Sequence, residues 1–408
     1  MKRCILLLGL VPLAGCGGGA PTPPVVRDSG GVTIIENFEP QWGRADSWRL
    51  ADTPVVDIGG ADVDSLHKIS RPVGCLRLED GRIVVANAGT QELRWFDPTG
   101  RYLLSSGSRG EGSTHFAALE WLGTTRSGDV AAFDFGRLQL SLFDPAGSFE
   151  QSISLVITFQ AEPGSVRGVL ADSSLVVIRD VRHWARSMTQ EASATEGLIR
   201  GPARVSHYSA TGEYLHEIGT FRGAERIFTK GSSRIVRVFG RPFGRAAVFA
   251  VSDDRVYVGT QDTYQIESYD IQGRLTAVVR VVREPRPVTA EIIERYVRGR
   301  LTGVHERERA ERQRQLAALP YPDTMPAYGA MLTDSDENLW VAEYRPFGDG
   351  TPTWTVFDAD HRMLGTVETP RGLAVHQIGT DFVIGSYRDE EDAYHIRVYR
   401  LEKPPEGG

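Results

Sequence analysis

The amino-acid sequence predicts an all-β fold built from a repeated four-stranded antiparallel unit. Stretches that read as turn, strand, loop and strand recur along the chain, and several end in an aromatic residue followed by Asp-x-x-Gly or a close variant. The first apolar residues of the second strands are spaced by 47, 45, 81, 83 and 43 residues; they are Ile83, Val130, Leu175, Val256, Leu339 and Phe382. Three of these gaps match the roughly 40–50 residues of one β-propeller blade. The spacing therefore favours a six-bladed β-propeller of four-stranded blades, with seven or eight blades as the alternative.

The clearest repeat is a hairpin turn. FDPTG at 96–100 and FDPAG at 143–147 are nearly the same sequence. In such a turn the Asp side chain caps the following backbone, Pro fixes φ, and Gly takes the left-handed conformation. The flanking stretches alternate apolar and polar residues, as in RVYVG at 255–259, which is typical of half-buried strands.

The two ends of the repeat region predict how the ring closes. The last unit offers three strand-like stretches, LAVHQIG, DFVIGSY and HIRVYRLE, but no fourth. TPVVDIGG at 53–60 has the pattern of an outer strand and belongs to no unit of its own. Pairing it with the last unit would complete that sheet and remove an exposed edge. We therefore expect the propeller to span residues 31–403.

The first residues predict export. Two basic residues, a short apolar core from Cys4 to Pro12 and the small residues Leu13-Ala14-Gly15 read as a signal peptide over 1–15. The apolar core is much shorter than the roughly 20 residues that span a bilayer. The Gly- and Pro-rich segment that follows predicts a flexible tether over 16–30.

Residues 13–16, Leu-Ala-Gly-Cys, resemble the bacterial lipoprotein box. The resemblance implies that Cys16 becomes the lipidated N-terminus and anchors the protein in the bacterial cell envelope. Gly17 stands where enteric lipoproteins retained at the inner membrane have aspartate, which implies sorting to the outer membrane. The alternative is an ordinary secretory signal cut before a neutral linker.

Composition limits the partners of the chain. The formal net charge of the 408 residues is −7, so the global basic surface of a nucleic-acid-binding protein is not expected. The chain has three cysteines, and Cys75 alone remains once Cys4 leaves with the signal and Cys16 carries lipid. Its apolar context, PVGCLRL, predicts a buried, unreactive thiol.

Two insertions interrupt the repeats. Residues 181–203 are expected to form a long loop within the third blade. Residues 288–319 predict a charged α-helix between the fourth and fifth blades, capped by Thr289 and carrying an apolar stripe of Ile293, Val297, Leu301 and Val304. This helix either packs its first half on the propeller and solvates the rest, or serves as a partner-binding arm.

The repeats as a whole resemble the six-bladed propellers of the NHL and TolB-like superfamily. They are similar in particular to lipid-anchored propeller proteins of uncharacterised function in Gemmatimonadota and related bacteria. The matching motifs are DGRIVV, FDPxG, PVTAEIIERYV, and PDTMPAYGAML followed by DENLWVAEY, and the resemblance covers roughly residues 54–401. It implies the fold and leaves the function open, because these motifs are turn and strand chemistry.

Signatures of catalysis and metal binding are weak. DSDEN at 334–338 begins like a calcium loop but lacks the glycine and the final glutamate. The nine histidines form no closely spaced pair, and no nucleophile elbow or phosphate loop occurs. The sequence therefore predicts no catalytic residue, no metal and no cofactor.

One constellation predicts a binding site. Arg71 lies 12 residues before Ile83, and Arg245 and Arg371 each lie 11 residues before their second strands. Tyr328 shares the spacing of 11 residues before Leu339. Ring symmetry would bring these four positions to one mouth of the central channel, where the arginines would favour an anionic group. The alternative is that each arginine pairs with a nearby carboxylate or backbone carbonyl.

These observations favour a lipid-anchored binding or scaffold module for a protein, peptide or glycan ligand. An enzyme like the six-bladed lactonases, hydrolases and sugar dehydrogenases, with a site over the channel, is one alternative. A sensor or assembly component acting through the charged helix is another. The membrane is the expected partner through the lipid anchor, and nucleic acid is not.

Overall fold

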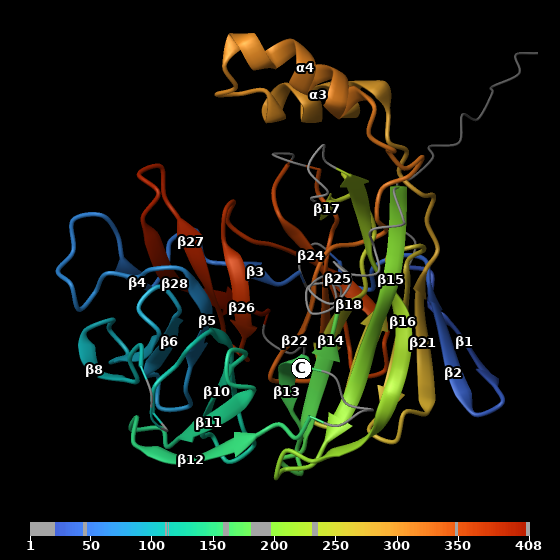
Figure 1. The fold of residues 1–408 in the computed structure, drawn as a ribbon. Helices are drawn as coiled ribbons and strands as arrows, with labels where there is room; N and C mark the ends of the chain where they lie inside the picture. The colour runs from blue at the N-terminus through green and yellow to red at the C-terminus, as the bar shows by residue number, and fades with distance from the viewer. Residues whose placement is uncertain are drawn as a thin grey trace, which may run out of the picture.

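The computed structural model describes residues 21–43, 47–110, 112, 114–157, 163–180, 197–230, 236–346 and 350–404. Their strands form six sheets, each with antiparallel neighbours except for one parallel pair, β2 with β21 (Figure 1). The first two sheets are β5(Pro72–Arg77)–β6(Ile83–Asn87)–β7(Glu92–Phe96)–β8(Tyr102–Ser106) and β9(Leu119–Thr124)–β10(Val130–Asp134)–β11(Gln139–Phe143)–β12(Phe149–Ser154). The third is β13(Ser165–Val169)–β14(Leu175–Arg179)–β15(Gly197–Tyr208)–β16(Tyr214–Lys230)–β17(Val236–Gly240).

The remaining sheets also take strands from the N-terminal segment. The fourth is β18(Val248–Val251)–β19(Arg255–Gly259)–β20(Gln265–Asp270)–β21(Leu275–Val281), extended by β2(Val32–Asn37) and β1(Val25–Ser29). The fifth is β22(Met331–Thr333)–β23(Leu339–Ala342)–β24(Thr353–Phe357)–β25(Met363–Glu368). The last is β26(Ala374–Ile378)–β27(Phe382–Arg388)–β28(Tyr394–Glu402), which pairs with β3(Arg49–Leu50) and β4(Val56–Gly59).

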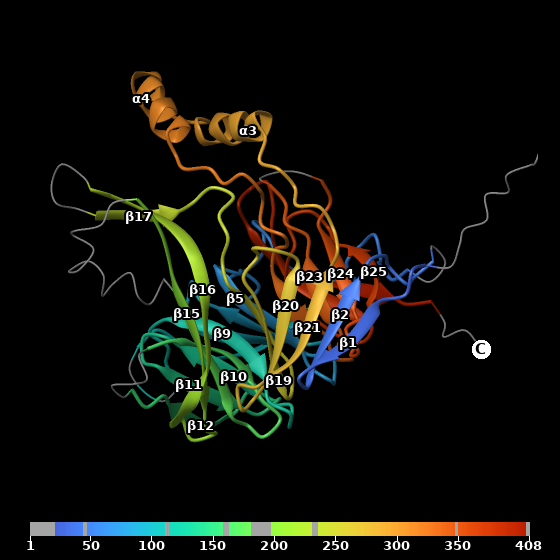
Figure 2. The ribbon, with the colours of Figure 1, turned by 90° about the vertical axis from the view of Figure 1, so that its right-hand side faces the viewer.

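The first strands of the sheets surround a central axis. β5 contacts β9, β9 contacts β13, and the series continues through β18, β22 and β26 back to β5. The sheets thus radiate from a closed ring of innermost strands, as in a β-propeller. Each innermost strand begins at the end of the ring that carries the helices, here called the upper end (Figures 1 and 2).

The predicted ring closure is confirmed. Val56–Gly59 pairs antiparallel with β28, so an N-terminal strand completes the last sheet. Gly59 has φ +110°, and a Cβ there would lie 2.2 Å from the carbonyl oxygen of Tyr394. Asp57 also accepts hydrogen bonds from Arg397 Nε at 2.9 Å and pairs with His395 Nδ1 at 2.7 Å. Backbone pairing, a required glycine and ion pairs therefore hold this joint.

The predicted tether over 16–30 is too long. Residues 25–29 form β1, which pairs with β2 across a turn at Gly30 and Gly31, and β2 adds to β21 in parallel. Both glycines have positive φ, +66° and +86°, which explains the double glycine between two strands. The signal peptide over 1–15 and Cys16 lie outside the described residues.

The hairpin turns behave as predicted. In the turn at 97–100, Asp97 Oδ1 accepts the backbone N–H groups of Thr99 and Arg101 at 2.8 and 3.0 Å. Gly100 and Gly147 have φ +90° and +93°. The hydroxyl and backbone donors around the Asp97 carboxylate hold its pKa below the ordinary value.

The predicted single helix over 288–319 is two helices, α3(Ala290–Arg300) and α4(Glu306–Ala317). The helical conformation is interrupted between them, where Gly303 has φ +76°. Thr289 is at the N-cap, but its side chain makes no capping hydrogen bond. The two helices form a hairpin that stands off the upper end of the sheets (Figure 2). Within the described part of the chain, no helix has the length and apolar character needed to cross a bilayer.

The structure also bears on the expected loop at 181–203 and on the expected burial of Cys75. The end of the predicted loop at 181–203 belongs to strand β15, which begins at Gly197, and residues 181–196 lie outside the described part. Cys75 is 0% exposed, which confirms the predicted burial, and that burial raises the pKa of its thiol.

Buried apolar side chains between neighbouring sheets, such as Trp95 and Phe143, form the core.

Candidate functional site in the central channel

Four innermost strands carry an extra residue at the centre of the ring. In β5, β9, β13 and β26 the pairing with the second strand skips one residue, and the skipped residues are Val73, Glu120, Arg167 and His376. Such a β-bulge turns the extra side chain away from the regular alternation and is common beside functional sites. The bulges thus select which side chains enter the channel.

Three of these residues line one cavity. Val73, Arg167 and His376 surround a space of about 520 Å³ together with residues of all six innermost strands, among them Trp121 and Phe249. The volume lies within the range of small-molecule sites, roughly 300–1,000 Å³. The fourth residue, Glu120, accepts from Arg167 Nη2 at 3.5 Å, so a carboxylate and a guanidinium are paired beside the cavity.

The other polar groups of the cavity include His376 and the carboxylate of Asp180. Burial lowers the pKa of His376 to about 4, so its imidazole is neutral near pH 7. Its Nε2 lies 2.9 Å from the hydroxyl of Ser386 on the neighbouring strand. Thr124 and Gln377 line both this cavity and a lower one of about 680 Å³, so the channel continues toward the opposite end of the ring.

The structure places the predicted Arg245 in a buried ionic cluster. Its side chain is 15% exposed; Nη2 donates to Thr324 Oγ1 at 2.7 Å, and Nε lies 3.7 Å from the Asp262 carboxylate. Glu225 accepts from Arg241 at 3.1 Å and lies 4.0 Å from Arg245 Nη1. Arg245 thus has carboxylate partners within the protein, as the alternative interpretation expects.

Asp262 is the second carboxylate of that cluster. Arg200 Nη1 donates to it at 2.7 Å. Burial alone would raise the pKa of Asp262, but the hydrogen bonds from Arg200 and Thr260 hold it below its ordinary value. The cluster ties the third sheet to the fourth and, through Arg241 and Arg245, to the segment that follows α4.

Tyr328 does not lie at a channel mouth, and the prediction for this residue is wrong. It is 0% exposed, and its hydroxyl donates to the backbone oxygen of Gln265 at 2.7 Å. Its ring packs 5.0 Å from that of Tyr264. The physical reason is that β22 begins only at Met331, so Tyr328 belongs to the segment that packs against the fourth sheet.

Arg71 and Arg371 are both exposed. Arg71 has φ +47°, and its Nη2 lies 3.5 Å from the backbone oxygen of Ala88. Convergence of these two arginines on one anion stays a prediction.

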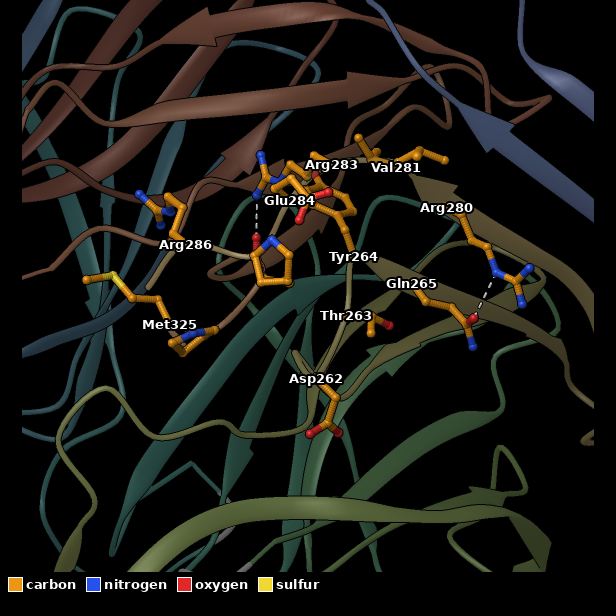
Figure 3. Close-up of a pocket in the computed structure, with 14 residues that line it drawn as sticks. Asp262, Thr263, Tyr264, Gln265, Arg280, Val281, Arg283, Glu284, Arg286 and Met325 are labelled. Atoms are coloured by element: carbon orange, nitrogen blue, oxygen red, sulfur yellow. Dashed lines mark hydrogen bonds between the residues drawn. The ribbon is translucent and has the colours of Figure 1, made fainter. Parts of the chain in front are cut away.

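A second cavity lies at the upper rim between the fourth and fifth sheets (Figure 3). It has a volume of about 360 Å³. Three arginines follow one another along its wall, namely Arg280, Arg283 and Arg286 (Figure 3). The Arg283 guanidinium lies 4.4 Å above the Tyr264 ring and 2.9 Å from Glu343, so this wall is held in place by a cation–π contact and an ion pair.

The DSDEN segment is a structural turn. The Asp334 carboxylate accepts the Asn338 backbone N–H, the Asn338 side-chain amide and the Trp340 indole N–H, each at 2.8 Å. Among the described residues no group of three or more His, Cys, Asp or Glu side chains is arranged to hold a metal ion.

Sequence reasoning missed the bulged residues. Glu120, Arg167 and His376 lie in short, largely apolar stretches, and one extra residue in such a stretch has no signature of its own. A bulge is visible only when the partner strand is known, because it is a mismatch in pairing.

No family model matches the sequence, and no curated protein matches it at a significant level. Similar solved structures include a protein described as exported from Bacteroides fragilis, with 13% identity, coverage of 91% of this chain and 100% of the other, and a TM-score of 0.45. A member of the DUF4221 family from Bacteroides vulgatus has 9% identity, coverage of 88% and 100%, and a TM-score of 0.49. A gluconolactonase from Xanthomonas campestris has 13% identity, coverage of 87% and 98%, and a TM-score of 0.44.

Proposed function

We propose that this protein is a lipid-anchored, extracytoplasmic binding module built on a six-bladed β-propeller, and that its ligand occupies the central channel. The observation that carries the proposal is the set of bulges, which aim Val73, Arg167 and His376 at one cavity from three different sheets. The signal-like N-terminus and Cys16 support a place in the cell envelope, at the outer membrane.

The chemistry of the cavity favours an uncharged ligand rich in hydroxyl groups, such as a sugar residue of a glycan. Arg167 is paired with Glu120, and a further carboxylate, Asp180, lines the cavity, so an anionic ligand is disfavoured. A guanidinium, a neutral imidazole, the Gln377 amide and the Thr333 hydroxyl supply donors and acceptors, and the Trp121 ring supplies an apolar surface.

The test is titration calorimetry of the purified protein with a panel of neutral oligosaccharides and the corresponding sugar acids. We expect a neutral member to bind, and Arg167→Ala and His376→Phe to weaken it by about tenfold or more, because each removes a hydrogen-bonding group from the cavity. Arg71→Ala, at the exposed upper surface, is the control and should bind as the wild type does. Thermal unfolding verifies that each variant is folded.

Equal affinity in Arg167→Ala, His376→Phe and wild type would contradict binding in the channel. Binding of the sugar acids alone would contradict the uncharged ligand.

A further inference from the structure

Three neighbouring cavities follow the segments that carry the helical hairpin on the upper face, and together they are here called the groove. The cavity of about 360 Å³ in Figure 3 shares Arg286 and Met325 with a neighbouring cavity of about 540 Å³. That cavity in turn shares Ile292 and Pro346 with one of about 280 Å³ beneath α3. The groove therefore runs from the outer part of the fourth sheet to the underside of the hairpin.

The walls of this groove are fixed. The two segments that lead to and from the helices pair through Val288 N–H to the Asp323 oxygen at 2.8 Å and Met325 N–H to the Arg286 oxygen at 2.9 Å. Under the hairpin, the Phe243 ring packs 5.5 Å from Tyr296 of α3. A pre-formed groove loses little conformational entropy when it binds a ligand.

The groove carries an excess of positive charge on an acidic protein. Its lining includes six arginines, namely Arg280, Arg283, Arg286, Arg295, Arg298 and Arg345. Three acidic residues line it, Asp262, Glu284 and Glu343. Arg200 pairs with Asp262, Arg283 pairs with Glu343, and Arg280 pairs with Glu36 outside the lining. Because the whole chain has a formal charge of −7, this local excess opposes the general charge of the molecule.

The floor of the groove is apolar. Met325 and Phe243 are 5% and 7% exposed, and Ile292 and Pro346 are half-buried between them. A long groove with an apolar floor and guanidinium groups along its walls matches an extended polypeptide that alternates acidic and apolar side chains.

We propose that this groove binds an extended acidic peptide segment of a partner protein. Lining arginines with no carboxylate partner among the described residues, such as Arg286 and Arg298, pair with its carboxylates, and its apolar side chains contact the floor. The site is separate from the central channel, and its occupation does not depend on the proposed channel ligand.

The test is fluorescence anisotropy with the purified full-length protein and a short labelled peptide in which glutamate alternates with leucine. Peptides with glutamine or lysine in place of glutamate are the comparisons. We expect the glutamate peptide to bind about tenfold or more tightly than the glutamine peptide, and the lysine peptide not to bind.

Two variants locate the binding. Arg286→Glu reverses a charge where two of the cavities meet, and Gly299→Trp fills the cavity beneath α3 without changing charge. A Cβ at Gly299 meets no atom within 4 Å, so this substitution is accommodated. Both should weaken the glutamate peptide by about tenfold or more, whereas Arg362→Glu, in an exposed turn at the opposite end of the ring, should not.

An unchanged affinity in Gly299→Trp would overturn the proposal and leave only attraction to surface charge. Equal binding of the lysine peptide, or tighter binding of a single-stranded oligonucleotide than of the glutamate peptide, would also overturn it. Arg167→Ala should bind the peptide as the wild type does, so a failure of channel binding is distinguished from a failure of groove binding.

Discussion

Buried charged side chains in this protein pair with other groups of the protein, which leaves them less available to a ligand. Arg245 illustrates this, since its spacing in the sequence predicts an anion site, while Glu225 and Asp262 already lie beside its guanidinium. A buried guanidinium requires a partner, because an uncompensated charge in the interior costs several kcal/mol. Which partner it finds depends on the neighbouring sheets.

Glu225→Gln should destabilise the protein strongly. Glu225 and Arg241 are 8% and 12% exposed, so the substitution leaves buried guanidinium groups with too little negative charge. We expect a loss of about 3–5 kcal/mol in the free energy of unfolding measured by urea denaturation. The control, Asp360→Asn, removes an exposed partner of Arg362 and should cost at most about 1 kcal/mol. Similar losses in both variants would mean that the cluster contributes no more than a surface pair.

Stability should fall as the pH drops from about 6.5 to 4. Burial, together with the nearby Arg255, lowers the pKa of His361 to about 4, and burial lowers that of His376 to about 4. In this window the unfolded chain binds protons that the folded protein does not, so acidification favours unfolding. Over this pH range, protonation of each histidine in the unfolded chain lowers the free energy of unfolding by about 3 kcal/mol at most.

Urea denaturation at a series of pH values measures this dependence. His361→Gln should show a shallower loss of stability between pH 6.5 and 4 than the wild type, whatever its absolute stability. His305→Gln, an exposed residue before α4, is the control and should keep the wild-type slope. A wild-type slope in His361→Gln would contradict the assignment.

At the scale of the strand, two devices adapt a common repeat to its position. Bulges in β5, β9, β13 and β26 turn one side chain of each strand aside at the channel. The second device is β4, which comes from the beginning of the chain and completes the last sheet. The bulges place side chains at the channel, and β4 keeps the ring closed.

Gly59→Val should open the ring closure. A Cβ at this position would lie 2.2 Å from the Tyr394 carbonyl oxygen, so β4 must move away from β28. We expect the melting temperature, measured by circular dichroism, to fall by clearly more than in Gly30→Val. Gly30 also has positive φ, but a Cβ there meets no atom within 4 Å, so its cost is backbone strain of about 1–2 kcal/mol. Equal shifts would show that closure does not depend on β4.

At the scale of the whole molecule, the upper end of the ring collects the features that distinguish this chain from a plain repeat. The helical hairpin, the buried arginine cluster and the groove all lie there, and Arg241 donates to the Pro320 oxygen at 2.5 Å to join the third sheet to the hairpin. The N-terminal hairpin of β1 and β2 also joins the fourth sheet with its first residues at this end. Val25 pairs with Glu36, and Glu36 lies beside Arg280 near the end of β21.

Cys16→Ser should release the protein from membranes. The small-residue box before Cys16 follows a basic start and an apolar core in the order that lipoprotein processing requires. We expect the wild type in the membrane fraction, and the variant as an uncleaved precursor without lipid label. Lys2→Ser, which leaves Arg3 and the box intact, is the control and should be lipidated. Normal processing and lipid labelling of Cys16→Ser would contradict the anchor.

The sequence by itself determined the local parts of this protein. Repeated turns, alternating strands and the closing strand at 53–60 could be predicted because each depends on a few adjacent residues, such as the Asp97 cap and Gly100. The burial of Cys75 followed from its apolar neighbours in the same way. The double glycine at 30–31 carried the signal of a hairpin, although the predicted tether ended at Gly30.

Only the tertiary structure decided which side chains meet. Glu120, Arg167 and His376 approach one channel because pairing slips by one residue in three separate strands, and such a slip depends on the partner strand. Tyr328 and Arg245 have the predicted spacing but different surroundings. Tyr328 lies in the segment that packs on the fourth sheet, and Thr324 of the same segment accepts from Arg245. Contacts between residues far apart in sequence depend on register and ring closure, and these arise only when the whole chain has folded.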